Sequence, residues 1–330
     1  MKVRHFIFKQ FPFVKLVYEI KSRAIRRKYP TEGGVSYDCL SLFCCNDICM
    51  SGGLCDRLNG IVSLYKVSKE KEIPFKIWYD SPFDLSDFLL PNSVNWQIGK
   101  EEINLRLSEI KIVSMPMMYE KLGMTYREEC ECHMRYLSYL FKHNRPKKQL
   151  HIYTNAHLAT GDCFSRLFNE LFVPSPFLRD ALNKNFQRIG SEYISVTFRF
   201  QNLLGDFKEG SSCELSKREQ EEYIEKCLMQ IQKLHSKHPD MKILVTADSV
   251  RFCRIANEKY QYVYIIPGNV VHMSYTRDAS IDVYLKSFVD LFMLANASKL
   301  FLLVTGRMYH SGFAQTASFI YNKPYEVIKF

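Results

Sequence analysis

The chain has 330 residues, of which 47% are hydrophobic and 24% charged, and its formal net charge is +10. This length provides for two domains of ordinary size, each with its own core, and the composition excludes a disordered chain. No stretch approaches the roughly 18 uncharged apolar residues of a membrane span, and the N-terminal residues lack the long apolar core of a secretory signal.

The chain begins with a basic amphipathic segment, which we place at residues 1–30. Residues 1–28 hold nine lysines and arginines and a single acid, Glu19, so they carry +8 of the net charge. Apolar side chains such as Phe8, Phe13 and Ile20 lie between the basic ones. The pattern is typical of a segment on the anionic inner face of a membrane, and also of a helix that packs on the protein and has a solvated basic edge. No module that reads or stacks on bases follows, so we expect no nucleic-acid partner.

An N-terminal α/β domain is predicted over residues 31–178, after a helix-breaking segment that contains Pro30, Gly33 and Gly34. Short apolar runs alternate with amphipathic runs along it. They predict strands at 39–45, 75–79 and 149–154, a mixed segment at 102–113, and helices at 57–70, 127–141 and 162–172.

A turn with two glycines connects the first predicted strand to the first helix of this domain. Gly52 and Gly53 let the backbone approach a ligand closely, and the amides at the N-terminus of a helix attract phosphates. Gly52, Gly53 and Arg57 are therefore candidate ligand-binding residues. Asp56, like Asp206 and Glu32, is a candidate catalytic base by its position alone. Many folds use such a turn merely as a tight connection, and that alternative stays open.

A C-terminal α/β domain is predicted over residues 179–330. The pattern predicts strands at 193–199, 242–246, 262–266 and 300–304, and helices at 216–236, 250–259, 281–297 and 311–321. Strands that alternate with helices indicate right-handed crossovers and mostly parallel sheets. The expected fold is therefore two facing Rossmann-like domains, in which ligands bind at the carboxyl ends of the strands.

Polar residues directly follow the predicted strands of the second domain. Arg199 ends the first of them, and a buried arginine needs an anion such as a diphosphate or a structural acid. Asp248 and Ser249 follow the next strand, either as nucleotide ligands or with Asp248 as a helix N-cap. The segment from Gly268 to His272 follows the third strand, and His272 is a further candidate ligand.

The last strand is followed by Ser311, Gly312 and Phe313, at the start of a helix. The Ser311 hydroxyl and the next two amides could hold a phosphate there, or Ser311 could simply be the N-cap.

Cysteine usage argues against a metal and against disulfides. The 11 cysteines are an odd number without a repeating framework, which indicates reduced thiols and a cytoplasmic protein. Cys44 and Cys45 lie in a predicted strand and would point to opposite faces, so a zinc site is not expected. The chain also has no G-x-S-x-G nucleophile elbow and no G-x-x-x-x-G-K phosphate loop.

Taken together, these segments resemble the fucosyltransferase-like branch of the GT-B glycosyltransferases, with its nodulation, α-1,6- and protein O-fucosyltransferases. The resemblance lies in the order of Gly52-Gly53, Thr197-Phe198-Arg199, the Thr246 to Ser249 segment and the Ser311 to Ala314 segment, over about residues 38–330.

The resemblance implies an inverting, metal-independent transfer of fucose from GDP-fucose to a glycan or a lipid-linked oligosaccharide. Arg199 would bind the diphosphate in the C-terminal domain, and the N-terminal domain would face the acceptor. The chain departs from the family pattern at Thr197, where the family has histidine, and at Phe200, where it has a second arginine. These departures leave two alternatives: another nucleotide-sugar donor, or a degraded protein that only binds nucleotide or sugar.

Overall fold

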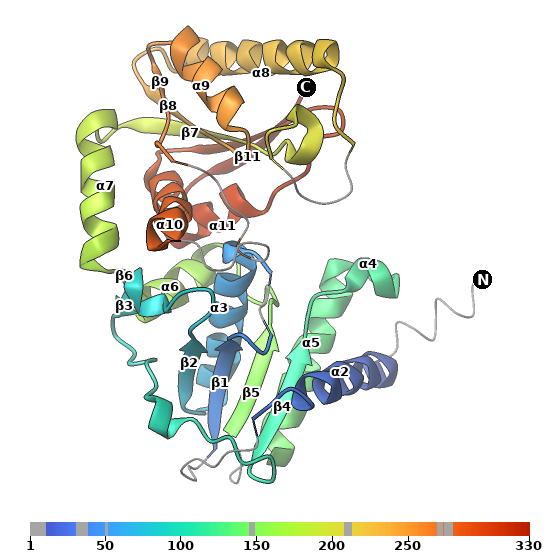
Figure 1. Ribbon diagram of the computed structural model, residues 1–330. Helices are drawn as coiled ribbons and strands as arrows, with labels where there is room; N and C mark the ends of the chain where they lie inside the picture. Colours follow the sequence, from blue (N-terminus) through green and yellow to red (C-terminus); the bar gives the residue numbers. More distant parts are fainter. Residues whose placement is uncertain are drawn as a thin grey trace. The chain divides into compact units, whose positions relative to one another are not determined.

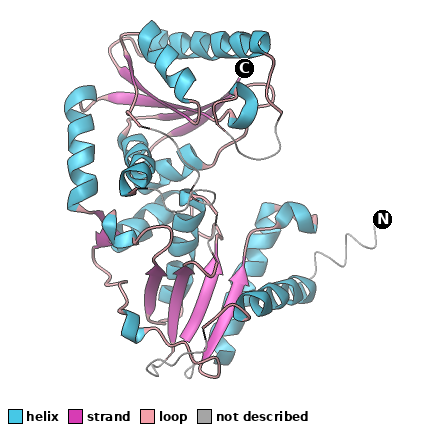
Figure 2. Cartoon of the chain, in the orientation of Figure 1, coloured by secondary structure: helices cyan, strands magenta, loops and turns pink. Residues whose placement is uncertain are grey.

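The computed structural model describes residues 11–30, 39–49, 52–144, 149–207, 213–268, 273 and 280–330. The chain divides into two compact units, one made of residues up to Ser86 together with Leu90–Val173, the other of Asp87–Leu89 and Pro174–Phe330. Each unit contains a parallel sheet with helices packed against it (Figures 1 and 2). This confirms the predicted α/β fold with mostly parallel sheets.

The first unit is built on a four-stranded sheet in the order β2-β1-β5-β4, and all of its strand pairs are parallel. The strands are β1 (Leu40–Cys45), β2 (Phe75–Tyr79), β4 (Ile110–Met115) and β5 (Gln149–Thr154). Of the mixed segment predicted at 102–113, only its end is strand, and a 3-10 turn (Lys100–Glu102) precedes it.

The helices of this unit are α2 (Phe11–Arg26), α3 (Leu54–Glu70), α4 (Tyr119–Leu122), α5 (Tyr126–Asn144) and α6 (Gly161–Leu171). Helix α3 lies against β1, β2 and β5. Gly60 allows this close approach, because a Cβ there would come within 2.1 Å of the Thr154 carbonyl oxygen.

The described part of the basic segment, from Phe11 onward, forms part of this unit, because α2 packs on β4 and α5. Residues 1–10 lie outside the described residues. Val14 and Tyr18 are fully buried, and the Ser22 hydroxyl accepts a hydrogen bond of 2.9 Å from the backbone amide of Ser114 in β4. Glu19 lies 3.1 Å from Lys111 and accepts a hydrogen bond from Tyr136 on α5. The structure thus differs from the separate segment predicted at residues 1–30. The alternative of a helix packed on the protein is confirmed for α2, because one of its faces is buried, and the membrane alternative stays a prediction.

The passage between the units also differs from the prediction. A two-stranded sheet pairs β3 (Leu89–Pro91) with β6 (Phe172–Pro174), and α7 (Pro176–Ile189) follows. A boundary at residue 178 would fall inside this helix. Ser175 caps α7 and Leu182 on it is buried, while the helix packs on α10 (Ile281–Asn296), so α7 belongs to the second unit.

The second unit is built on a five-stranded parallel sheet in the order β11-β10-β7-β8-β9. The strands are β7 (Tyr193–Phe198), β8 (Lys242–Ala247), β9 (Val263–Tyr264), β10 (Leu300–Val304) and β11 (Tyr325–Lys329). Strand β9 is shorter than the predicted 262–266, and β11 was not predicted. Because β7 is central, its carboxyl end lies between those of β10 and β8.

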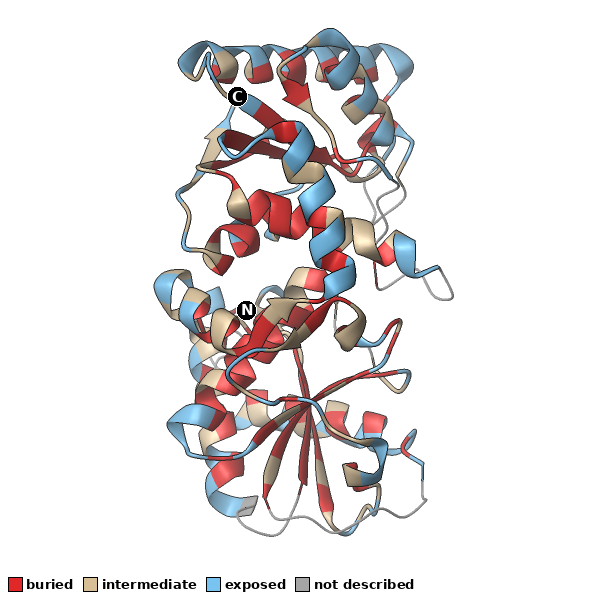
Figure 3. Cartoon of the chain, turned by 90° about the vertical axis from the view of Figure 1, so that its left-hand side faces the viewer, coloured by how far each residue is buried: buried red, intermediate tan, exposed pale blue. Residues whose placement is uncertain are grey.

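Helices cover both faces of this sheet. A core between β7, β8, α8 (Lys217–Lys237) and α9 (Val250–Lys259) contains Val196, Phe198, Ile231 and Phe252. On the other side, the Tyr193 hydroxyl donates to the Met293 carbonyl oxygen on α10, which packs on α11 (Phe313–Ile320). Figure 3 shows the buried strands and the exposed outer face of α8.

Candidate functional site

The carboxyl edge of the second sheet gathers three of the predicted segments. Arg199 follows β7, Asp248 follows β8, and residues 305–312 follow β10, which are the three central strands. Strand order therefore brings together residues that are far apart in the sequence, and it does so where parallel sheets bind ligands.

The Arg199 side chain is largely buried at this edge, with 17% of it exposed. Its Nη1 lies 3.4 Å from Asp248 Oδ2, and its guanidinium lies 4.9 Å from the centre of the Phe207 ring. Burial lowers the pKa of Arg199, against the attraction of Asp248. An arginine keeps its charge even so, and a desolvated guanidinium fork suits a diphosphate.

Asp248 fixes the turn that follows β7. Its two carboxylate oxygens accept hydrogen bonds from the backbone amides of Phe200 and Gln201, at 2.8 and 2.7 Å. Burial raises the pKa of Asp248, while Arg199 and these amides favour its charged form. The side chain is fully buried, so Asp248 acts on the site by holding Arg199 and its turn in place.

The helix cap predicted for Asp248 is provided by its neighbour. The Ser249 hydroxyl accepts the Phe252 amide at 3.0 Å and donates to Asp206 at 2.9 Å. The cap prediction for Asp248 is therefore wrong, because its carboxylate turns back toward the β7 loop. Ser249 is fully buried as well, in a structural role.

The last of the three segments leaves open backbone at the start of α11. Gly312 is the N-cap residue and has no side chain to cap the helix, and Ser311 Oγ accepts the Phe313 amide at 3.2 Å. A Cβ on Gly312 would meet nothing within 4 Å. The segment is tied to Arg199, whose carbonyl oxygen accepts the Tyr309 amide at 3.0 Å. His272 lies outside the described residues.

In the first unit, the side chains of Asp56 and Arg57, at the start of α3, hold the double-glycine turn in place. Gly52 has a φ of +67°, and Gly53 is the N-cap of α3, with its amide bonded to Asp56 Oδ2 at 3.0 Å. Arg57 is fully buried; it donates to the Gly52 carbonyl oxygen at 2.9 Å and to the Tyr79 hydroxyl at 2.7 Å. Arg57 thus braces the turn from inside, while 43% of the Asp56 side chain is exposed.

A cavity of about 340 Å³ opens at the carboxyl edge of the first sheet. Gly52, Ser114, Pro116 and Asn155 line it at the ends of the strands, and Lys21 of α2 adds a positive charge. This contribution of α2 could not be predicted from the sequence, because only the fold places α2 beside the ends of β4 and β5.

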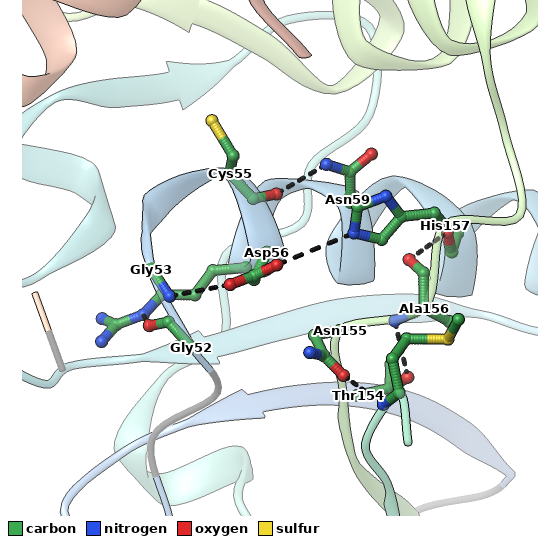
Figure 4. A network of polar contacts seen from close by, with 12 residues as sticks. Gly52, Gly53, Cys55, Asp56, Asn59, Thr154, Asn155, Ala156 and His157 are labelled. Atoms are coloured by element: carbon green, nitrogen blue, oxygen red, sulfur yellow. Dashed lines mark hydrogen bonds and ion pairs between the residues drawn. The ribbon is translucent and has the colours of Figure 1, made fainter. Parts of the chain in front are cut away.

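His157 is a second residue that the sequence pattern did not indicate. It follows β5, and its Nε2 lies 3.8 Å from Asp56 Oδ1 (Figure 4). A single histidine in a loop carries no signal in the sequence, so only the fold could reveal this pair.

No group of three or more histidines, cysteines or acids is placed to hold a metal ion in the described parts of the chain. Helices long and apolar enough to cross a membrane are likewise missing from those parts.

The comparisons with known proteins depend on the fold alone, because neither a protein-family model nor a curated protein matches the sequence. NodZ α-1,6-fucosyltransferase soaked with GDP-fucose is similar over 89% of this chain and 94% of its own, at 12% identity and a TM-score of 0.54. NodZ from Bradyrhizobium covers 86% and 92%, at 12% identity and a TM-score of 0.52. A mutant of Arabidopsis thaliana FUT1 in complex with GDP covers 94% and 74%, at 10% identity and a TM-score of 0.53. The chain therefore has the GT-B fold of these fucosyltransferases over nearly its whole length.

Proposed function

We propose that the protein is a glycosyltransferase that moves fucose from GDP-fucose to a glycan, with inversion and without a metal ion. The observation that carries the proposal is the buried Arg199 at the end of the central strand β7, held by Asp248. Its support is the fold, which is shared with two kinds of fucosyltransferase whose structures contain GDP or GDP-fucose.

In this proposal the second unit binds the donor. Arg199 contacts the diphosphate and stabilises its growing negative charge as the bond to fucose breaks, as preorganised donors do in other enzymes. The open backbone at Gly312 receives a phosphate oxygen. Asp248 keeps the guanidinium in position and touches no substrate.

The test is fucose transfer from GDP-fucose to a panel of glycans in the presence of EDTA. Arg199→Ala should lower kcat by about 100- to 1000-fold, as loss of a preorganised donor does, and Arg199→Lys should restore little because an ammonium lacks the planar fork. Arg218→Ala is the matched control, since Arg218 of α8 is exposed. The stereochemistry of the product, read by NMR, tests inversion. A strict need for magnesium or manganese would contradict the metal-free mechanism.

Two observations favour a second candidate, a protein that binds the nucleotide sugar without turning it over. The Thr197 hydroxyl lies 2.9 Å from that of Thr246, and Phe200 is fully buried against Phe198 and Phe252. The side chains at both positions that depart from the family pattern therefore have their partners within the protein: a hydroxyl group for Thr197, and aromatic rings for Phe200. GDP binding with no transfer and no donor hydrolysis would favour this candidate, and a response to UDP instead of GDP would favour another donor.

The exposed face of α2 supports a peripheral position on an anionic membrane. Leu16 and Ile20 are 54% and 56% exposed and lie one helical turn apart; the exposed Arg23 is in the last turn of the helix, and the exposed Arg27 directly follows it. An exposed apolar stripe beside basic side chains suits a lipid surface, where each basic residue adds about 1 kcal/mol.

Vesicle co-sedimentation tests this position. The wild type should bind vesicles that contain phosphatidylserine, and the double variant Leu16→Ser/Ile20→Ser should bind them less while its melting temperature is unchanged. Met229→Ser, at an exposed position of α8, is the matched control. Equal binding by the double variant and the wild type would refute the role of this face.

A further inference from the structure

Strand β11 forms an open edge of the five-stranded sheet in the second unit. It pairs with β10 on one side and packs on α11, and no other strand pairs with it in the described parts of the chain. Glu326 and Lys329 are exposed, and the side chains between them, Val327 and Ile328, are only partly buried. An edge of this kind presents backbone groups that can pair with another chain.

The backbone of β11 points its polar groups in two directions. The Pro324 carbonyl oxygen accepts the Leu300 amide of β10 at 2.9 Å. At the other end, the Phe330 amide donates to the Val304 carbonyl oxygen at 3.2 Å. Alternate residues of a strand bond to the same neighbour, so the even-numbered residues of β11 face β10 and the odd-numbered residues face away from it.

The outward-facing residues of β11 are Tyr325, Val327 and Lys329. Each has one backbone amide and one carbonyl group, and no hydrogen bond to these groups is found among the described residues. The three residues are spaced evenly around Val327, so the edge has the same order of donors and acceptors in either direction. An edge with this symmetry can pair antiparallel with a copy of itself.

A two-fold axis through Val327 gives the register that uses every outward-facing group. The two copies of Val327 then bond to each other, and Tyr325 of each copy bonds to Lys329 of the other. Each opposed pair exchanges two hydrogen bonds, which makes about six in total. An axis through any other residue of β11 would leave some of these groups unpaired. An axis through Lys329 would also place two ammonium groups opposite each other, which is unfavourable.

The charges along the edge are compatible with this register, although charged side chains often protect sheet edges from pairing. Glu326 lies opposite Ile328 of the second copy, and its carboxylate is already paired with Lys299 of β10 at 2.6 Å. Lys329 lies opposite Tyr325, whose ring can receive an ammonium group on its face. Like charges therefore do not meet across the pair.

The opposite edge of the same sheet does not match β11. Strand β9 consists of Val263–Tyr264 alone, so it provides too short a ladder for the five residues of β11. Head-to-tail pairing of β11 with β9 would build an open fibre, and the short β9 disfavours it. Pairing of β11 with itself closes at two copies.

We propose that two copies of this chain associate through β11, antiparallel and with the two-fold axis at Val327, and so join their sheets into one continuous sheet. The partner is a second copy because the edge is complementary to itself in length, in hydrogen bonds and in charge. The association does not depend on the proposed function.

The test is sedimentation velocity of the full chain over a concentration series up to about 100 μM, a range that detects association with a micromolar Kd. A reductant is present throughout, because the cysteines are free thiols and Cys213 is exposed. The wild type should pass from monomer to dimer and go no further. The double variant Leu16→Ser/Ile20→Ser should do the same, which separates this association from contacts through the exposed face of α2.

A charge swap at the axis tests the register. Val327→Glu alone and Val327→Lys alone place like charges opposite each other, so each should raise the Kd of the dimer about tenfold or more. An equimolar mixture of the two variants should form a dimer that neither forms alone. Met229→Glu, at an exposed position of α8, is the matched control and should dimerise as the wild type does. Thermal unfolding of each variant at a concentration at which the wild type is monomeric checks that it is folded.

Hydrogen exchange is a second readout that needs no variant. The amides of Tyr325, Val327 and Lys329 should exchange slowly at high protein concentration and quickly at low concentration. The amides of Glu326 and Ile328 should be protected at both, because they face β10. The inference would be overturned by a wild type that stays monomeric or grows beyond a dimer, or by Val327→Glu that dimerises as tightly as the wild type. Edge amides that exchange equally fast at both concentrations would overturn it as well.

Discussion

Removing the Asp248 carboxylate should destabilise the second unit much more than removing Arg199. Asp248→Ala leaves the amides of Phe200 and Gln201 without their acceptor in a buried turn. Each unpaired buried amide costs about 1–3 kcal/mol, so the pair costs about 4 kcal/mol. In a unit of this size 1 kcal/mol shifts the melting temperature by about 2–4 °C, so we expect a drop of about 8–16 °C.

Arg199→Ala has a different effect, because Asp248 keeps both amide partners. Burial already raises the pKa of Asp248, so the carboxyl can take up a proton once its cationic partner is gone. The expected loss is about 1 kcal/mol, within the range of a typical single hydrogen bond. The assay is thermal unfolding of both variants without nucleotide, followed by circular dichroism. If Asp248→Ala melted within 2–4 °C of the wild type, at a cost of about 1 kcal/mol or less, the structural role of Asp248 would be refuted.

Three further predictions concern pH and two glycines. Burial lowers the pKa of His133 to about 4 and of His151 to about 3, from 6.5, so their stabilisation is complete above about pH 6.5 and is lost as the pH falls toward these values. At pH 5 each histidine should lower the free energy of unfolding of the first unit by about 2 kcal/mol, at 1.36 kcal/mol per pH unit below 6.5. A melting temperature that stays constant from pH 7.5 to 5 would contradict this prediction. His143→Gln is the control at an exposed position. Gly312→Ala should leave stability unchanged, since a Cβ there meets nothing, but should weaken GDP binding measured by calorimetry; unchanged GDP affinity would exclude this backbone from the site. Gly52→Ala should lower the melting temperature of the first unit, because its φ is +67° and a Cβ would lie 2.5 Å from an Asp56 oxygen; a fully stable variant would argue against the turn as described.

The fold could be predicted well because its signals are local. Apolar runs separated by amphipathic ones indicate the strands and helices, and Gly52 with Gly53 marks the turn into α3. The rule for parallel sheets then correctly placed Arg199 and Asp248 at one edge. The prediction of β9 was too long, since only Val263–Tyr264 is strand, and the terminal β11 was missed because its pattern is too weak.

The partners of individual side chains could not be predicted, because they depend on long-range packing. Nothing in the sequence says that Asp248 turns toward the β7 loop while Ser249 caps α9, or that Arg57 is buried under its own turn. The amphipathic pattern of α2 fitted a membrane and a protein surface equally well, and Tyr18 shows which face is buried. His157 became a candidate only when the fold brought it to Asp56.

The most direct test of the account is nucleotide binding measured by thermal shift in the presence of EDTA. GDP at 100 times its dissociation constant should stabilise the wild type by about 2.7 kcal/mol, whereas UDP, ADP and CMP at the same concentration should have little effect. The GDP response should disappear in Arg199→Ala and persist in Arg218→Ala. A wild type that responds to UDP and not to GDP, or an Arg199→Ala variant that responds as the wild type does, would contradict the central claim that Arg199 binds the diphosphate of a GDP-sugar.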